Sequence, residues 1–182
     1  MDGVSRARGP AEEDHMSHRK SRFSRIALAV LALCCACAST SKPKGPEQIA
    51  IAYLDAQRYA DALRESEKLV RIEPRNVDYR LVAARANEGA GDPERALRHL
   101  EMAEELAPEN AEPVILIGEL EQRRNRPDDA YVAFRRATTL APEELRAWRG
   151  LALTAEALGF DAEAERAYAR WAQLEKTQGG GP

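Results

Sequence analysis

The chain has 182 residues, with 27 lysines and arginines, 30 aspartates and glutamates, and a formal net charge of −3 at pH 7. This length suits one folded domain with a short additional segment. The mildly acidic balance, without a basic stripe along the chain, argues against a nucleic-acid-binding protein.

The first element along the chain is an uninterrupted apolar run from Ile26 to Ala38, which follows four basic residues between Arg19 and Arg25. The run is thirteen residues long, whereas a helix that spans a membrane needs about 20. A basic stretch before a short apolar core is typical of a secretory signal. The natural start of this signal is Met16, because the preceding residues are polar and fit no part of it. We therefore interpret residues 1–36 as a signal segment, with Met16 as the alternative start of the chain.

All three cysteines, Cys34, Cys35 and Cys37, lie at the end of this run, and the first and last form a C-x-x-C pair. A redox pair of this kind normally sits beside a βαβ pattern with a helix start that lowers its pKa, and no such pattern is present. A zinc site needs four ligands, but there is no second cysteine pair, and His99 is the only histidine after the run. The sequence therefore predicts neither a redox centre nor a metal site.

Leu33, Ala36 directly before Cys37, and the small polar residues that follow resemble the lipobox of bacterial lipoproteins. The resemblance implies that the Cys37 thiol receives a diacylglyceryl group and that the chain is cleaved between Ala36 and Cys37. Ala38 in place of aspartate after the anchor implies transport to the outer membrane, on its periplasmic face, by the sorting rule of proteobacterial lipoproteins. Residues 37–45 would then be the lipidated cysteine and a polar tether of roughly 15 Å.

Two alternatives to this interpretation remain. Cys35 or Cys34 could carry the lipid instead of Cys37. Plain cleavage after Ala38, at the A-x-A-like sequence ACA, would instead release a soluble periplasmic or secreted protein. Cleavage before Cys37 leaves at most one cysteine, so the fold must be stabilised by packing rather than by an internal disulfide.

A period of 34 residues runs through the rest of the chain. It is carried by alanines and by prolines that are expected to end a helix: Ala62, Ala96, Ala130 and Ala164; Pro74, Pro108 and Pro142. This period and placement resemble the tetratricopeptide repeat. Four units follow one another, at 43–76, 77–110, 111–144 and 145–178. The resemblance implies an all-α fold over residues 46–178, an α-solenoid of eight antiparallel helices, followed by a flexible tail at 179–182.

Small residues in each unit suit a close crossing of its two helices, because a larger side chain would overpack the contact. On the second helix of each unit they are the four periodic alanines, and on the first helix they are Ala50, Ala84, Gly118 and Ala152. Asp92 is expected to cap a helix that Pro93 starts. Gly91 and Gly159 are expected to end first helices, where a positive φ is required.

The last unit departs from the others at one position. Trp171 stands where the second and third units have Ala103 and Ala137. Those alanines leave room for the next helix, and after the last unit none is expected. Trp171 is therefore expected to cover the open end of the stack. The alternative is an aromatic contact for a partner, which Tyr168 would share.

In tetratricopeptide domains the first helices line a concave groove that holds an extended or helical peptide. The groove positions of the family correspond here to a mixed set of apolar and charged residues: Ile51, Leu54, Leu81, Arg85, Ile115, Glu119, Arg149 and Leu153. This set lacks the Lys/Asn pattern of the members that clamp a C-terminal carboxylate, so that class of ligand is disfavoured.

The sequence offers no residues for catalysis. It has no Gly-rich phosphate loop, no G-x-S-x-G and no H-E-x-x-H, and its acidic pairs are expected on solvated helix faces. We expect no enzyme activity, cofactor or small-molecule substrate. The prediction is an adaptor or assembly factor that binds a protein or peptide segment of an envelope complex, as in pilus or secretin machinery. The alternative is an accessory scaffold for outer-membrane protein insertion or for cell-wall enzymes.

Overall fold

The computed structural model describes residues 47–179. The expected signal segment, the lipidation site Cys37 and the tether lie outside the described residues, as do residues 180–182 of the tail.

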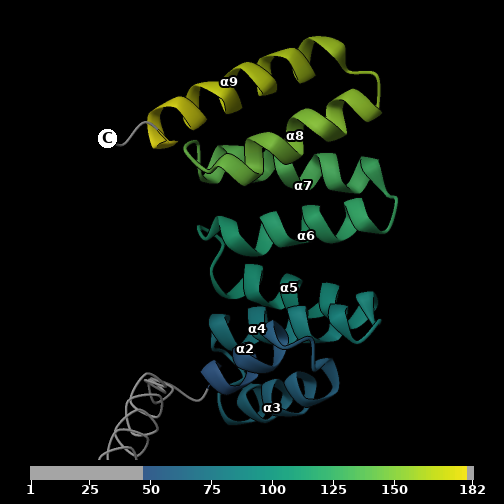
Figure 1. Ribbon diagram of the computed structural model, residues 1–182, viewed down its shortest axis with the longest axis vertical. Helices are drawn as coiled ribbons and strands as arrows, with labels where there is room; N and C mark the ends of the chain where they lie inside the picture. The colour runs from purple at the N-terminus through teal and green to yellow at the C-terminus, as the bar shows by residue number, and fades with distance from the viewer. Residues whose placement is uncertain (1–46, 180–182) are drawn as a thin grey trace, which may run out of the picture. The chain divides into compact units, whose positions relative to one another are not determined.

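The described residues form helices joined by short turns, without a strand among them. The helices are α2 (Glu47–Asp55), α3 (Tyr59–Ile72), α4 (Val77–Gly89), α5 (Pro93–Leu106), α6 (Ala111–Arg123), α7 (Pro127–Leu140), α8 (Leu145–Ala157) and α9 (Asp161–Gly179). They stack in chain order from α2 and α3 to α9 (Figure 1). The predicted all-α solenoid is confirmed.

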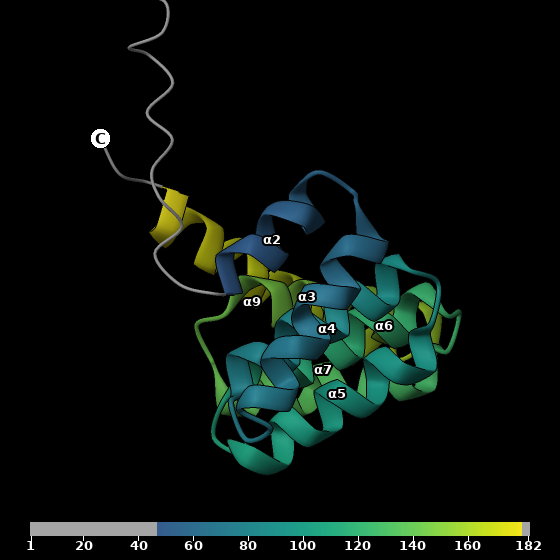
Figure 2. The same cartoon turned by 90° about the horizontal axis from the view of Figure 1, so that it is seen from below.

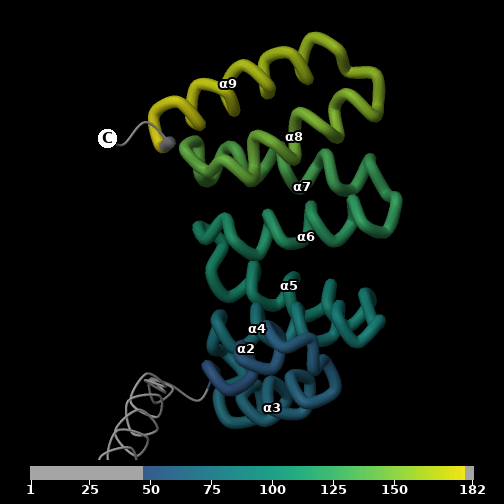
Figure 3. Tube along the Cα trace, in the orientation of Figure 1, coloured from purple at the N-terminus to yellow at the C-terminus, as the bar shows by residue number. Residues whose placement is uncertain are grey.

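Each unit is an antiparallel helix pair, and the turns alternate between the two sides of the stack. The turns within the third and fourth units lie on one side, and those that join α5 to α6 and α7 to α8 lie on the other (Figure 3). Seen from the end formed by the first unit, successive units overlie one another (Figure 2). As a result, α2, α4, α6 and α8 form one layer, with contacts between α2 and α4 and between α6 and α8.

Local sequence signals set where the helices begin and end. The side chain of Asp92 accepts a hydrogen bond from the backbone N–H of Arg95 (3.0 Å) and Pro93 is the first helical residue, as predicted. Gly91 and Gly159 have φ values of 84° and 75°, the left-handed conformation expected of them. Asn125 takes the same conformation, with φ of 58°, which asparagine tolerates better than most residues.

Small residues fill the crossings between paired helices. The periodic alanines of the second helices are buried, as are Ala50, Ala84, Gly118 and Ala152 of the first helices. The tightest contact surrounds the Phe134 ring on α7, which is almost fully buried. A Cβ added at Gly118 would lie 2.9 Å from this ring, and one added at Gly150 would lie 2.3 Å from it. Glycine is therefore required on both α6 and α8 for the ring to fit.

The end of the stack is formed by α9. Ala103 and Ala137 are fully buried, whereas Trp171 at the equivalent position is half-buried. Its ring lies 6.2 Å from the ring of Tyr168, centroid to centroid. The Tyr168 hydroxyl donates a hydrogen bond to Glu156 on α8 (2.6 Å). Both aromatic rings are thus tied into the last helix pair, and their use as a partner contact stays a prediction.

Candidate functional site

Two hollows open on the layer formed by the first helices. The α2–α4 hollow, about 410 Å³, is lined by Ile51, Leu54, Asp55, Tyr59, Arg85, Glu88 and Gly89. The α6–α8 hollow, about 290 Å³, is lined by Glu119, Gln122, Arg123, Phe134, Arg146, Arg149, Gly150 and Leu153. We call the two together the groove. Its floor depends on Gly150, since a side chain there would displace the Phe134 ring.

Six of the eight residues predicted to line the groove do line these hollows: Ile51, Leu54, Arg85, Glu119, Arg149 and Leu153. Leu81 does not, because its half-buried side chain packs on the cluster around Leu100 and Leu116.

The prediction that Ile115 offers an apolar contact to a ligand is wrong. Its side chain is only 1% exposed and belongs to a core cluster with Phe134 and Leu151. The reason is the next unit, since α8 supplies Leu151 to this cluster. Arg149 occupies the equivalent position on α8, where no further first helix follows within residues 47–179, and it is exposed.

The charged groove residues are joined by ion pairs between helices. Glu112 at the start of α6 accepts hydrogen bonds from Arg85 on α4 (3.2 Å) and from Arg146 on α8 (2.9 Å). Arg146 also contacts Glu119 at 3.0 Å. Burial lowers the pKa of Arg146, but the hydrogen bond to Glu112 and the charge of Glu119 outweigh that effect, so its pKa is raised overall. The network spans three successive units.

Two charged residues that were predicted to line the groove take part in these pairs. Arg85 is paired with Glu112, and Glu119 is paired with Arg146. Both pairs are partly exposed, and such pairs stabilise a fold by only about 0–1 kcal/mol. A charged ligand can therefore exchange with them at low cost.

Glu112 and Arg146, the centre of the network, were missed from the sequence. A signal for them exists, because they lie 34 residues apart and so occupy the same position in successive units. Opposite charges at one repeat position, on first helices that lie side by side, predict a pair across the two units. Among the described residues, no group of histidine, cysteine, aspartate or glutamate is suited to hold a metal ion.

The sequence comparison agrees with this geometry. A profile described as tetratricopeptide repeat matches residues 48–111 and 115–179, which together are well over half of the chain. The chain belongs to the tetratricopeptide repeat family. No curated protein matches the sequence.

Solved structures share the fold of this tetratricopeptide domain. A crystal structure of MamA matches with a TM-score of 0.69 and 18% identity, over 94% of this chain and 100% of that chain. A structure of pilF from Pseudomonas aeruginosa has a TM-score of 0.66 and 22% identity, over 72% of this chain and 60% of that one. The first tetratricopeptide domain of RPAP3, bound to the HSP90 peptide SRMEEVD, has a TM-score of 0.58 and 18% identity, over 63% and 90%.

The fold is that of a protein–protein interaction scaffold, and the groove of this tetratricopeptide domain is electrically asymmetric. The α6–α8 hollow has three arginines, Arg123, Arg146 and Arg149, and one acid, Glu119. The α2–α4 hollow has two acids, Asp55 and Glu88, and one arginine, Arg85. Glu88 is paired with Arg123 of the other hollow, so Asp55 and Arg149 are the charges that make no ion pair within the described residues. Ile51 and Leu153 are the exposed large apolar residues of the two hollows. They add contacts for uncharged side chains. Such a surface suits a chain that carries charges of both signs around apolar residues.

Within the described residues, no helix is long and apolar enough to cross a membrane.

Proposed function

We propose that this chain is a non-catalytic adaptor or assembly factor that binds an extended peptide segment of an envelope protein along the groove. The observation that carries the proposal is the pair of hollows of opposite charge on one helix layer. An acidic part of the peptide lies in the α6–α8 hollow, where Arg149 makes no ion pair within the described residues, and a basic part lies near Asp55. The affinity expected of so small a contact is micromolar, about −8 kcal/mol.

The proposal includes a lipid anchor at Cys37 and a place at the bacterial outer membrane, on the periplasmic side. It is supported by the lipobox-like residues before and after Cys37 and by the apolar run that precedes them. An anchor at one membrane raises the effective concentration of the groove for partners there, so a micromolar site is sufficient. Pilus or secretin machinery is the first candidate for the assembly served. Loss of palmitate labelling in Cys37→Ser tests the anchor at Cys37; unchanged labelling would move the anchor to Cys34 or Cys35.

The groove is tested by photo-crosslinking in intact cells. A crosslinking residue placed at Leu153 or at Ile51 should capture the same protein, because the two positions lie in the two hollows of one groove. The same residue placed at Val132, an exposed position on α7, is the control and should not capture it. Capture from Val132 alone, or of unrelated proteins from Leu153 and Ile51, contradicts the groove.

A charge reversal measures what the groove contributes. Arg149→Glu should weaken binding of the captured segment at least tenfold, with the helical signal and melting temperature unchanged, because Arg149 is exposed on α8. Arg75→Glu is the matched control, since Arg75 is an exposed arginine outside both hollows. Equal losses in the two variants would mean that net charge, and not the groove, determines binding.

A further inference from the structure

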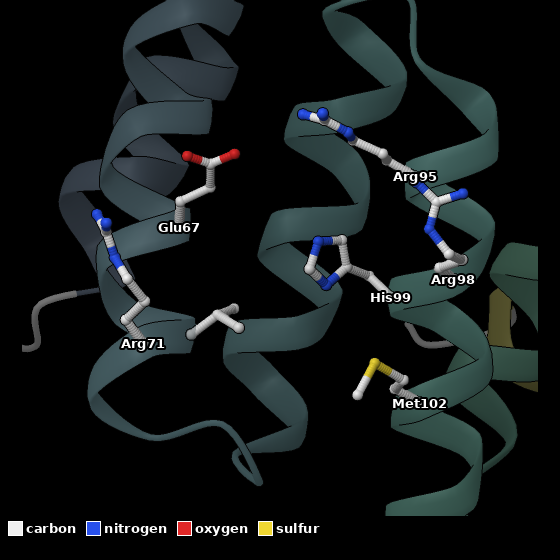
Figure 4. A pocket seen from close by; sticks show the side chains of 7 residues that line it. Glu67, Arg71, Arg95, Arg98, His99 and Met102 are labelled. Carbon is white, nitrogen blue, oxygen red and sulfur yellow. The ribbon is translucent and has the colours of Figure 1, made fainter.

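A third hollow lies in the layer of second helices, away from the groove. It has a volume of about 470 Å³ and is lined by Glu67, Val70 and Arg71 from α3 and by Arg95, Arg98, His99 and Met102 from α5. We call it the α3–α5 hollow. Figure 4 shows the His99 ring between the two helices and Arg95 extending from α5 toward α3, with Arg71 and Arg98 at the outer edges of the hollow. No part of the proposed function uses these residues.

The α3–α5 hollow is rich in cations although the chain as a whole is acidic, with a net charge of −3. Three arginines face one acid, Glu67. Arg95 is paired with Asp92 at 3.2 Å. Arg71 and Arg98 make no ion pair with any of the described residues 47–179. Exposed arginines that outnumber the acids of the hollow and make no ion pair leave a positive potential that attracts anionic groups.

A buried arginine on the neighbouring helix α4 adds to this positive potential. Arg80 on α4 is only 7% exposed. Its Nε and Nη2 donate to the carbonyl oxygen of Pro74 at 2.9 and 2.6 Å, and its Nη1 lies 3.2 Å from the sulfur of Met102. Within the described residues no carboxylate lies within ion-pair distance of it, whereas buried charges are ordinarily paired. Its charge is therefore not neutralised by the fold.

His99 connects this buried charge to the hollow. Nη1 of Arg80 lies 3.4 Å from Nδ1 of His99. A guanidinium has no lone pair to offer, so Nδ1 is the acceptor and the ring proton of neutral His99 is on Nε2. Burial, and then the charges of Arg80 and Arg98, lower the pKa of His99, which keeps the ring neutral at pH 7. His99 is therefore a hydrogen-bond donor at Nε2.

The hollow also offers apolar contact. Met102 is 42% exposed, and Val70 is half-buried on the facing helix. Methionine adapts its shape to irregular apolar groups. Apolar contacts between cationic walls suit an acidic segment with an apolar side chain better than an isolated inorganic anion.

We propose that the α3–α5 hollow is a second binding site, which takes an acidic peptide segment of a partner protein with carboxylates on either side of an apolar residue. Carboxylates pair with Arg71 on one wall and with Arg98 on the other, and the apolar residue contacts Met102. The two binding sites lie on different helix layers, so one chain can hold two segments at once. The site does not depend on the groove, and either can fail alone.

The test is a binding titration of the full chain with labelled peptides. The probe is a short peptide of glutamates around a central leucine, followed by fluorescence anisotropy, with a second peptide in which lysines replace the glutamates. We expect micromolar binding of the acidic peptide and at least tenfold weaker binding of the basic one. Arg71→Glu with Arg98→Glu should weaken acidic-peptide binding at least tenfold, while Arg149→Glu in the groove should leave most of it.

The matched control is Arg75→Glu with Arg166→Glu, which changes net charge equally at two exposed arginines outside the hollow. If the reversal at Arg71 and Arg98 lowers the melting temperature, the pair Arg71→Gln with Arg98→Gln replaces it, with the same expectation. The proposal is overturned if the control pair loses as much binding, or if the Arg149→Glu variant accounts for the whole loss. It is also overturned if phosphatidylglycerol vesicles, but not the acidic peptide, need Arg71 and Arg98.

Discussion

The groove and the α3–α5 hollow use the same residue types in opposite ways. In the groove, arginines from α4 and α8 meet at Glu112 and are neutralised across three units, and Arg149 is the one groove arginine without an ion pair within the described residues. In the hollow, Arg71 and Arg98 have no acidic partner among the described residues, and Arg80 is buried without one. Charges paired between units stabilise the stack weakly. Charges left unpaired raise the local potential and are available to a ligand.

The largest expected effect comes from removing a core side chain that lies under the groove and not under the α3–α5 hollow. Phe134→Ala removes the ring under the α6–α8 hollow, and truncating a fully buried phenylalanine costs about 3–5 kcal/mol of unfolding free energy. Urea denaturation measures it, and binding in the groove should be lost with it. Val132→Ala on the same helix is the control, because Val132 is 65% exposed, and should change stability by less than about 0.5 kcal/mol. Similar losses in both variants would contradict the packing described here.

A smaller effect is expected when the groove is made to resemble the hollow. Glu112→Gln removes the acid that Arg85 and Arg146 share, which leaves Arg85 without an ion pair and Arg146 paired with Glu119 alone. Loss of these exposed pairs should cost about 0–1 kcal/mol each. Binding of the glutamate–leucine peptide by the groove should become several-fold tighter, as the anisotropy titration would report in a background of Arg71→Gln with Arg98→Gln. Weaker binding by the Glu112→Gln variant would mean that Glu112 positions its arginines for the ligand.

The smallest effect concerns pH and belongs to the hollow alone. The pKa of His99 is lowered, first by burial and then by Arg80 and Arg98, so it lies below the ordinary value of about 6.5. At pH values between the lowered pKa of the folded chain and the ordinary pKa of the unfolded chain, the unfolded chain binds more protons at His99 than the folded one. The stabilisation that neutral His99 gives the folded state is therefore complete above pH 6.5 and is lost as the pH falls from there through the lowered pKa.

The free energy of unfolding should therefore be lower at pH 5.5 than at pH 7.5. In the His99→Gln variant this difference between the two pH values should be smaller. Glu112→Gln in the groove is the control and should keep the full loss. If His99→Gln has the same pH dependence as the unmodified chain, the contact between Arg80 and His99 does not control the protonation of this ring.

Much of the fold was predictable because it depends on local signals that recur. The structure has the crossing alanines and the cap at Asp92 where they were expected. Each of them acts over a few residues, and the 34-residue period repeats them from unit to unit. The conformations of Gly91 and Gly159 were predictable for the same reason. Family geometry extended this to the groove, since Ile51, Arg149 and Leu153 do line its hollows.

The sites were less predictable, because they depend on which side chains of different helices meet. Ile115 and Arg149 share one repeat position, yet the first is buried by the following unit and the second is exposed. The contact of Arg80 with His99 joins residues 19 apart in the chain, and no local pattern marks it. The hollow around it was not predicted at all.

By itself the sequence determined the repeat, the helix pairs and the all-α stack, because turn residues, small crossing residues and caps act within one unit. Only the tertiary structure decided which charges neutralise each other and which remain free. Pairing requires two side chains from neighbouring units to come within about 4 Å. That distance is set by how the units stack, through contacts such as the Phe134 ring against Gly118 and Gly150.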